Sequence, residues 1–213
     1  MSAVRNKGPL QGLASALRES PALWWSFLYF FCLLSGYYVL RPVREAMAAS
    51  ADLETVFPPV LIAWFASHGI ALKDFVLQFL FSCVFVIMLV LQPVYGWLVS
   101  RFPRRVFLPA VYGFFIVTLL GFYMMFDSGV PGRGMAFFFW ITVFNLFAVA
   151  VFWSFMADVF DNDHAKRYYG YIGAGGTLGA FLGPFITTMF VGRIGVANLP
   201  LVSAGFLAVC LLC

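Results

Sequence analysis

Long apolar runs alternate with short polar turns along this chain. A run of about 20 apolar residues is long enough to cross the hydrocarbon core of a bilayer as a helix. Five such runs lie between residues 23 and 191, and a sixth begins near Gly195 and is still apolar at Cys213, so we expect it to be truncated there. The pattern predicts an all-α integral membrane protein, a bundle of six transmembrane helices at about 23–40, 75–99, 106–126, 135–156, 168–191 and 195–213.

One further apolar segment, residues 56–70, interrupts this regular pattern. It is broken by Pro58-Pro59 and by Ser67-His68-Gly69, and its length is short for a transmembrane helix. If it crossed the bilayer, the basic N-terminal residues and the later arginine-rich turn would face opposite sides, against the positive-inside rule. We therefore expect a re-entrant or an interfacial segment.

The composition agrees with a membrane protein, because 63% of the residues are hydrophobic and only 10% are charged. Soluble domains carry roughly a quarter charged residues. The net charge of +4 comes from basic residues at the ends of the apolar runs rather than along one stripe. We interpret this excess as control of topology, with the lipid bilayer as partner and no nucleic acid.

The basic residues also orient the chain. Arg101, Arg104 and Arg105 share the short turn between the second and third spans, and Lys and Arg are retained on the cytoplasmic side. This places the turn and the N-terminal segment 1–22 in the cytoplasm of a multi-pass inner (plasma) membrane protein. The predicted cytoplasmic segments hold Arg5, Lys7, Arg18, Arg101, Arg104, Arg105, Lys166 and Arg167, against Arg41, Arg44, Lys73, Arg133 and Arg193 outside.

No constellation in the sequence indicates catalysis. The cysteines lie inside apolar runs without a CxxC pair, and no nucleophile–base pair is visible, so we expect no enzyme, no metal site and no cofactor. A nucleotide-binding loop is also excluded near Gly173, because Leu178 stands where GxGxxG requires glycine. Six polar residues within the spans are expected to form hydrogen bonds between helices rather than ligand contacts: Gln78, Gln92, Asn145, Thr177, Thr187 and Thr188.

A cluster of charges lies at the end of the first span. On a helix, Arg41, Arg44 and Glu45 have i,i+3 and i,i+4 spacing and share one face. Ionisable groups at membrane depth usually pair or line a substrate path, and a guanidinium suits phosphate oxygens. The cluster therefore favours an anionic substrate. Alternatively, Pro42 ends the helix at about Leu40, and the charges lie in the outer loop.

The fifth span carries Gly175, Gly179, Gly183 and Pro184. Glycines four residues apart line one face of a helix and allow another helix to approach closely, and proline can introduce a kink. We expect this face to pack against a neighbour and to flex there.

The arginine-rich turn resembles the loop signature between the second and third helices of the major facilitator superfamily. Ser100 and Pro103 depart from it, standing where the family has Asp and Gly. A second likeness is the acid at the end of the fourth span and the arginine before the fifth. The resemblance implies a cytoplasmic gate made of Gly96, Arg101, Arg104, Arg105, Asp158 and Arg167.

A narrower resemblance is to the ATP:ADP antiporter family, in its wider bacterial branch. It is carried by Leu40-Arg41 with Arg44-Glu45 and by Trp153-Ser154-Phe155-Met156-Ala157-Asp158, although Pro42 is inserted and Arg44 and Glu45 replace Lys and Asp. This likeness implies nucleotide exchange and about twelve helices. The chain would then be an N-terminal half that needs a second six-helix half, in cis or in trans.

Together these observations predict a transporter that moves an organic or phosphorylated anion, such as a nucleotide, by alternating-access exchange. Arg41, Arg44 and Glu45 would contact the substrate. The rival interpretation is a membrane scaffold or regulatory protein that does not transport, or an inactive truncated transporter.

Overall fold

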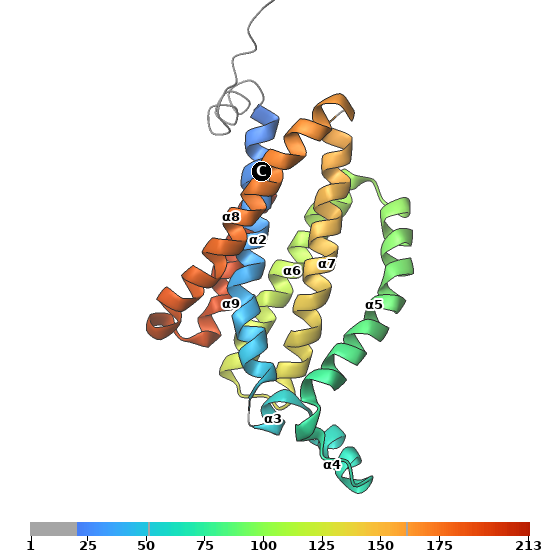
Figure 1. The fold of residues 1–213 in the computed structure, drawn as a ribbon, viewed down its shortest axis with the longest axis vertical. Coiled ribbons are helices and arrows are strands. Elements are labelled where there is room, and N and C mark those ends of the chain that lie inside the picture. The colour runs from blue at the N-terminus through green and yellow to red at the C-terminus, as the bar shows by residue number, and fades with distance from the viewer. Residues whose placement is uncertain (1–20, 51, 161) are drawn as a thin grey trace, which may run out of the picture.

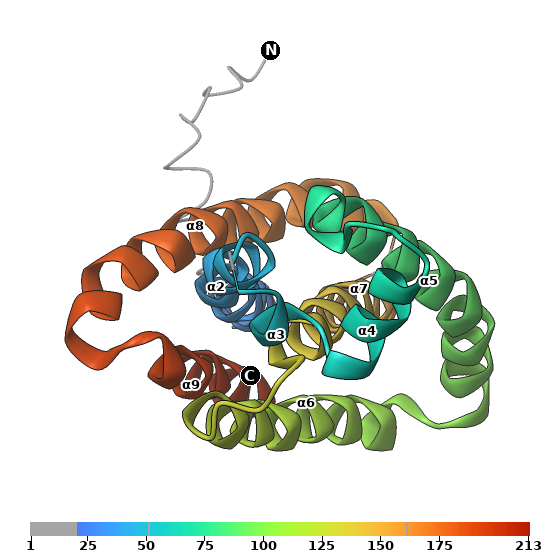
Figure 2. The ribbon, with the colours of Figure 1, turned by 90° about the horizontal axis from the view of Figure 1, so that it is seen from below.

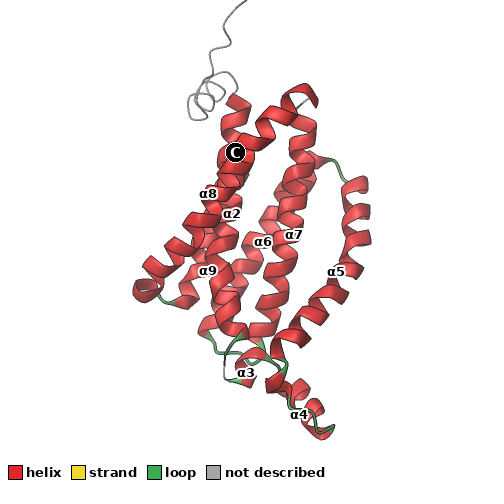
Figure 3. Ribbon diagram, viewed as in Figure 1, coloured by secondary structure: helices red, strands yellow, loops and turns green. Residues whose placement is uncertain are grey.

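The computed structural model describes residues 21–50, 52–160 and 162–213, without the side chains of residues 104, 105, 127 and 162–167. These residues form helices and no strand (Figure 3). The long helices are α2 (Pro21–Ala48), α5 (Val76–Arg101), α6 (Arg104–Asp127), α7 (Arg133–Val159), α8 (Asn162–Ile194) and α9 (Leu199–Leu212). The short helices are α3 (Leu53–Val56), α4 (Pro59–Ser67), η1 (Leu72–Asp74) and η2 (Val196–Asn198).

The predicted all-α membrane bundle is confirmed. Helices α2, α5, α6, α7 and α8 each contain a stretch that is long and apolar enough to cross a bilayer. The apolar helical stretch Val196–Leu212, which includes α9, is shorter. That a sixth helix crosses the bilayer therefore stays a prediction. The assignment of residues 1–22 to the cytoplasm also stays a prediction, because residues 1–20 with Arg5, Lys7 and Arg18 lie outside the described part of the chain.

Successive long helices run in alternating directions (Figure 1). The start of α2, the α5–α6 turn and the α7–α8 junction lie at one end of the bundle, which we call the Arg101 end. The end of α2, helices α3 and α4, and the α6–α7 and α8–α9 turns lie at the other end, the Arg41 end. The predicted gate and the charge cluster of α2 are therefore at opposite ends of the molecule.

Helix α2 is the centre of the bundle. It packs against α7, α8 and α9, and Figure 2 shows these helices around it. Aromatic side chains fill the contact with α7, where Phe30 stacks on Phe152 with ring centroids 4.4 Å apart. Helix α5 is different, because Leu80 alone is buried among its residues. The second helix thus lies at the edge of the bundle, with most of its apolar surface uncovered.

The predicted re-entrant or interfacial segment, residues 56–70, contains α4, with α3 at its start and η1 just after its end. Figure 1 shows α4 beyond the ends of the long helices. A small core that includes Val56, Phe57 and Phe65 anchors the segment against Leu80 and Phe138. Gly132 allows this contact, because its φ of 77° is left-handed and a Cβ there would lie 3.0 Å from Pro58. A position beyond the helix ends favours the interfacial over the re-entrant interpretation.

Candidate functional site

The three charged residues of the predicted substrate site lie on one continuous helix. Arg41 Nε donates to Glu45 Oε1 over 2.9 Å, and Arg44 Nη2 donates to the same oxygen over 3.4 Å. Two guanidiniums therefore share one carboxylate, which leaves a net charge of +1. The structure brings Arg41, Arg44 and Glu45 together as their spacing predicts.

Helix α2 continues through Pro42 to Ala48, so the alternative that the helix ends at about Leu40 is wrong. Proline removes one backbone donor, and neighbouring side chains commonly stabilise the helix at such a site in membranes. The carbonyl that loses its helical donor is that of Tyr38, four residues before Pro42. At the adjacent Val39 carbonyl, Thr187 of α8 donates from Oγ1 over 2.8 Å and attaches α8 to this part of α2. This bond is also the interhelical hydrogen bond expected of a polar residue inside the bundle.

The two arginines have different surroundings. The Arg44 side chain is 11% exposed, and its guanidinium carbon lies 5.0 Å from the centroid of the Phe138 ring of α7. Its Nε is buried and has no hydrogen-bond partner in the protein. The Arg41 and Glu45 side chains are 46% and 54% exposed. Arg44 is thus a desolvated cation with an unused donor, whereas Arg41 and Glu45 face outwards.

The helical rise shows how deep the cluster lies. Trp24 and Trp25 are exposed at the start of α2, as expected for interfacial aromatic residues. Seventeen residues separate Trp24 from Arg41, which corresponds to about 26 Å at 1.5 Å per residue. Since the hydrocarbon core is about 30 Å thick, Arg41 would lie near its far edge and not at its midplane.

The glycine face of α8 packs against α2, the helix that carries the charges. A Cβ on Gly179 would lie 2.5 Å from the Phe31 carbonyl oxygen, and a Cβ on Gly183 would lie 2.5 Å from Tyr38 Cβ. Gly175 similarly faces the Phe27 carbonyl oxygen at 2.8 Å. These glycines let the two backbones touch, and Pro184 follows them inside α8.

The predicted gate residues share the Arg101 end of the bundle. Arg101 is the last residue of α5, α6 begins at Arg104, and Asp158 lies in the last turn of α7. Gly96 lies five residues before Arg101 on α5, and a Cβ there would have no neighbouring atom within 4 Å. The side chains of Arg104, Arg105 and Arg167 lie outside the described part of the structure, so the contacts between the gate residues are not tested. The gate stays a prediction.

Two residues of the site were not predicted from the sequence. Tyr38 lies under Arg41, with 5.6 Å between the guanidinium carbon and the ring centroid, and Phe138 lies under Arg44. Tyr38 precedes Arg41 by three residues, a helical spacing that signals this contact. Phe138 is one of three consecutive phenylalanines of α7, and nothing in its sequence distinguishes it from its neighbours.

The fold and the placement of the charges define a class of protein, a polytopic helical membrane protein with polar groups at both ends of an apolar bundle. Comparison with known families narrows this class. The Major Facilitator Superfamily profile matches residues 46–213, and the chain belongs to this family of membrane transporters. Comparison with curated proteins and with solved structures gave no match. The match begins just after Glu45, so it identifies a transporter but gives no role to Arg41, Arg44 and Glu45. It also gives no support to the ATP:ADP antiporter-like branch.

Proposed function

We propose that this transporter moves an organic or phosphorylated anion, and that Arg41 and Arg44 attract it. The observation that carries the proposal is the excess of positive charge at the Arg41 end of α2, where two guanidiniums share one carboxylate. In an environment of low dielectric, an anion compensates such an excess more strongly than it would in water.

Arg44 and Glu45 have distinct roles in this proposal. Arg44 Nε is a buried donor without a partner, so a phosphate or carboxylate oxygen would satisfy it. Glu45 accepts from both arginines and holds their guanidiniums close together. When an anion arrives, it competes with Glu45 for Arg41, whose side chain is half exposed.

The position of the cluster supports a role at the outer end of the path. Arg41 lies near one edge of the estimated hydrocarbon core, and alternating access places the main substrate site near the midplane between two halves. The cluster therefore captures the anion before it reaches that site. A second six-helix half, in cis or in trans, supplies the opposite wall, and the gate at the Arg101 end closes the cytoplasmic side. Exchange of one anion for another completes the cycle.

Uptake into vesicles that carry the full-length protein tests this function. The solutes are a labelled nucleotide, a small phosphate ester, a dicarboxylate and an uncharged nucleoside. We expect uptake of at least one anion and none of the nucleoside. A charge-assisted hydrogen bond contributes about 1.5–3 kcal/mol, so Arg44→Ala should raise the apparent KM about tenfold or more. Vesicles preloaded with the same anion should take it up faster if transport is an exchange.

Arg193→Ala is the matched control, because Arg193 is an exposed arginine near the Arg41 end but outside the cluster. It should leave uptake unchanged. Uptake of an anion that is insensitive to both Arg41→Ala and Arg44→Ala would remove the site assignment. No uptake of any tested anion by a folded protein would instead favour a membrane scaffold.

A further inference from the structure

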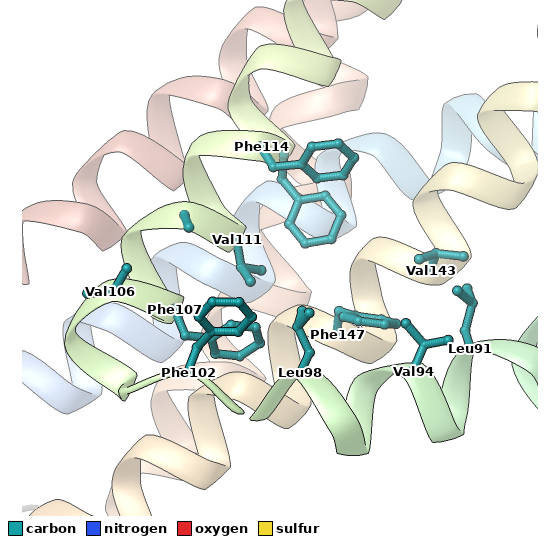
Figure 4. A pocket seen from close by; sticks show the side chains of 12 residues that line it. Leu91, Val94, Leu98, Phe102, Val106, Phe107, Val111, Phe114, Val143 and Phe147 are labelled. Atoms are coloured by element: carbon teal, nitrogen blue, oxygen red, sulfur yellow. The ribbon is translucent and has the colours of Figure 1, made fainter. Parts of the chain in front are cut away.

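An apolar groove outside the predicted substrate path lies between α5, α6 and α7. Its volume is about 530 Å³, and all its lining side chains are apolar. Figure 4 shows Leu91 and Val94 of α5 on one side, Val111 and Phe114 of α6 on the other, and Phe147 of α7 between them. Phe114 and Val94 are also exposed, so the groove is open to the surface of the bundle.

One mouth of the groove reaches the arginine-rich turn. Phe102 and Val106, which line the groove, lie on either side of Pro103, the N-cap of α6. The turn places Arg101 before Phe102 and Arg104 and Arg105 after Pro103, and it contains no acidic residue. The apolar groove therefore opens next to a concentration of positive charge.

An exposed aromatic residue marks the level of this mouth in the bilayer. Trp97 lies beside Phe102, with ring centroids 6.4 Å apart, and its side chain is exposed. Tryptophans on the outer surface of membrane proteins gather at the level of the lipid headgroups. The turn that begins at Arg101 then lies at headgroup level, and the groove extends from it into the hydrocarbon region.

We propose that this groove binds one anionic phospholipid, with an acyl chain between α5 and α6 and the headgroup phosphate at the arginine-rich turn, beside Arg101. Clusters of basic residues between transmembrane helices bind acidic lipid headgroups by electrostatic attraction. The apolar lining and the charged mouth together match the two parts of such a lipid. A soluble anion would use the arginines alone and leave the groove uncovered.

Binding would support the most weakly packed helix of the bundle. Among the described residues of α5, Leu80 alone is buried, and it lies near the start of the helix, far from the turn. An acyl chain in the groove covers Val94 and Leu98 in the other half of α5. The lipid therefore holds α5 against α6 and α7 and stabilises the turn that joins α5 to α6.

Native mass spectrometry of the purified full-length protein tests the proposal. The probes are dioleoylphosphatidylglycerol, dioleoylphosphatidylcholine with the same acyl chains, and glycerophosphoglycerol without acyl chains. We expect phosphatidylglycerol to be retained more strongly than phosphatidylcholine, and glycerophosphoglycerol not to be retained. Each arginine contributes roughly 1 kcal/mol near a charged lipid surface. The preference should therefore fall about fivefold for Arg101→Gln and further when Arg104 and Arg105 are also replaced.

A second variant tests the groove itself. Ala110 lines it, so Ala110→Phe should reduce retention of phosphatidylglycerol severalfold. The matched controls are Ala208→Phe, at an exposed position of α9, and Arg193→Gln, at the opposite end; both should bind as the unaltered protein does. Equal retention of the two phospholipids by the unaltered protein would overturn the proposal, whatever the variants do. Undiminished binding by a folded Ala110→Phe variant would also overturn it, as would binding of glycerophosphoglycerol alone.

Discussion

The burial of Arg44 is hard to explain by a contribution to the stability of the fold. Its side chain is largely buried, its Nε lacks a partner, and the Glu45 oxygen that it reaches is 3.4 Å away. An unsatisfied buried donor costs about 1–3 kcal/mol, which the contact with Phe138 offsets by about 0.5–2 kcal/mol. A cation in this position is more easily understood as a binding group than as part of the packing.

We therefore expect Arg44→Met to stabilise the protein while it impairs transport. Methionine keeps the apolar stem and removes both the charge and the unpaired donor, so the gain should be about 1 kcal/mol, or an increase in Tm of a few degrees. Arg41→Met should change stability by less than about 0.5 kcal/mol, because the Arg41–Glu45 pair is half exposed. Thermal unfolding in detergent measures both variants. A marked loss of stability for Arg44→Met would show that Arg44 is structural.

Thr187 permits a second test at this scale, with a matched control on the same helix. Its hydroxyl donates to the Val39 carbonyl of α2, whereas the hydroxyl of Thr177 donates only within α8, to the Gly173 carbonyl. Interhelical hydrogen bonds in membrane proteins contribute about 0.6 kcal/mol on average and up to about 1.7. Thr187→Val should therefore lower stability by about this amount and Thr177→Val should not, as measured by unfolding in SDS. Equal effects would mean that the bond across the helices adds nothing.

At the scale of elements, the contact between α2 and α8 is the tightest in the bundle. The glycines of α8 bring its backbone against the carbonyl groups of α2, and Thr187 and Ser203 attach α8 and α9 to the Val39 and Gly36 carbonyls of α2. Helix α5 has no comparable contact along most of its length. Movement within this bundle is therefore expected at α5 before it is expected at α2 or α8.

Adding one methyl group to the glycine face should test how tight this contact is. Gly179→Ala places a Cβ about 2.5 Å from the Phe31 carbonyl oxygen and 3.0 Å from the Ser35 nitrogen, so the two backbones must separate. Overpacking of this kind costs about 1–3 kcal/mol. Gly173→Ala, on the same helix with open space around it, should be neutral or stabilise the helix by up to about 1 kcal/mol. Unfolding in SDS should separate the two variants, and equal stability would contradict a close α2–α8 contact.

The sequence predicts the helices of this bundle better than it predicts their contacts. Apolar length alone places α5, α6, α7 and α8, and helical spacing alone brings Arg41 to Glu45. The continuation of α2 through Pro42 is not predictable in this way, because the local pattern alone leaves both a helix and a helix end possible at a proline. The partner of the glycine face and the burial of Arg44 against Phe138 also depend on distant segments, which local patterns do not encode.

At the scale of the whole molecule, the two ends of the bundle differ in chemistry. The Arg101 end carries the arginine-rich turn and the α7–α8 junction, and the Arg41 end carries the charge cluster and the apolar α4. An orientation with the Arg101 end in the cytoplasm satisfies the positive-inside rule. It also places α4, with Trp64 and Val60 exposed, at the outer interface. In this orientation, α4 and the charge cluster that we propose to attract the anion both lie at the outer surface.

This orientation predicts which positions a membrane-impermeant thiol reagent reaches in intact cells. Alanine replaces the native cysteines of the full-length protein, and Ser100→Cys, Ser128→Cys and Ser67→Cys are introduced one at a time at exposed positions. Ser100 lies in the last turn of α5, just before the start of α6, and Ser128 is the C-cap of α6. The 24 residues of α6 span about 36 Å, more than the hydrocarbon core. We expect labelling of Ser128→Cys and Ser67→Cys in intact cells, and of Ser100→Cys only after permeabilisation. Labelling of Ser100→Cys from outside would reverse the orientation, and the cluster of Arg41, Arg44 and Glu45 would then face the cytoplasm.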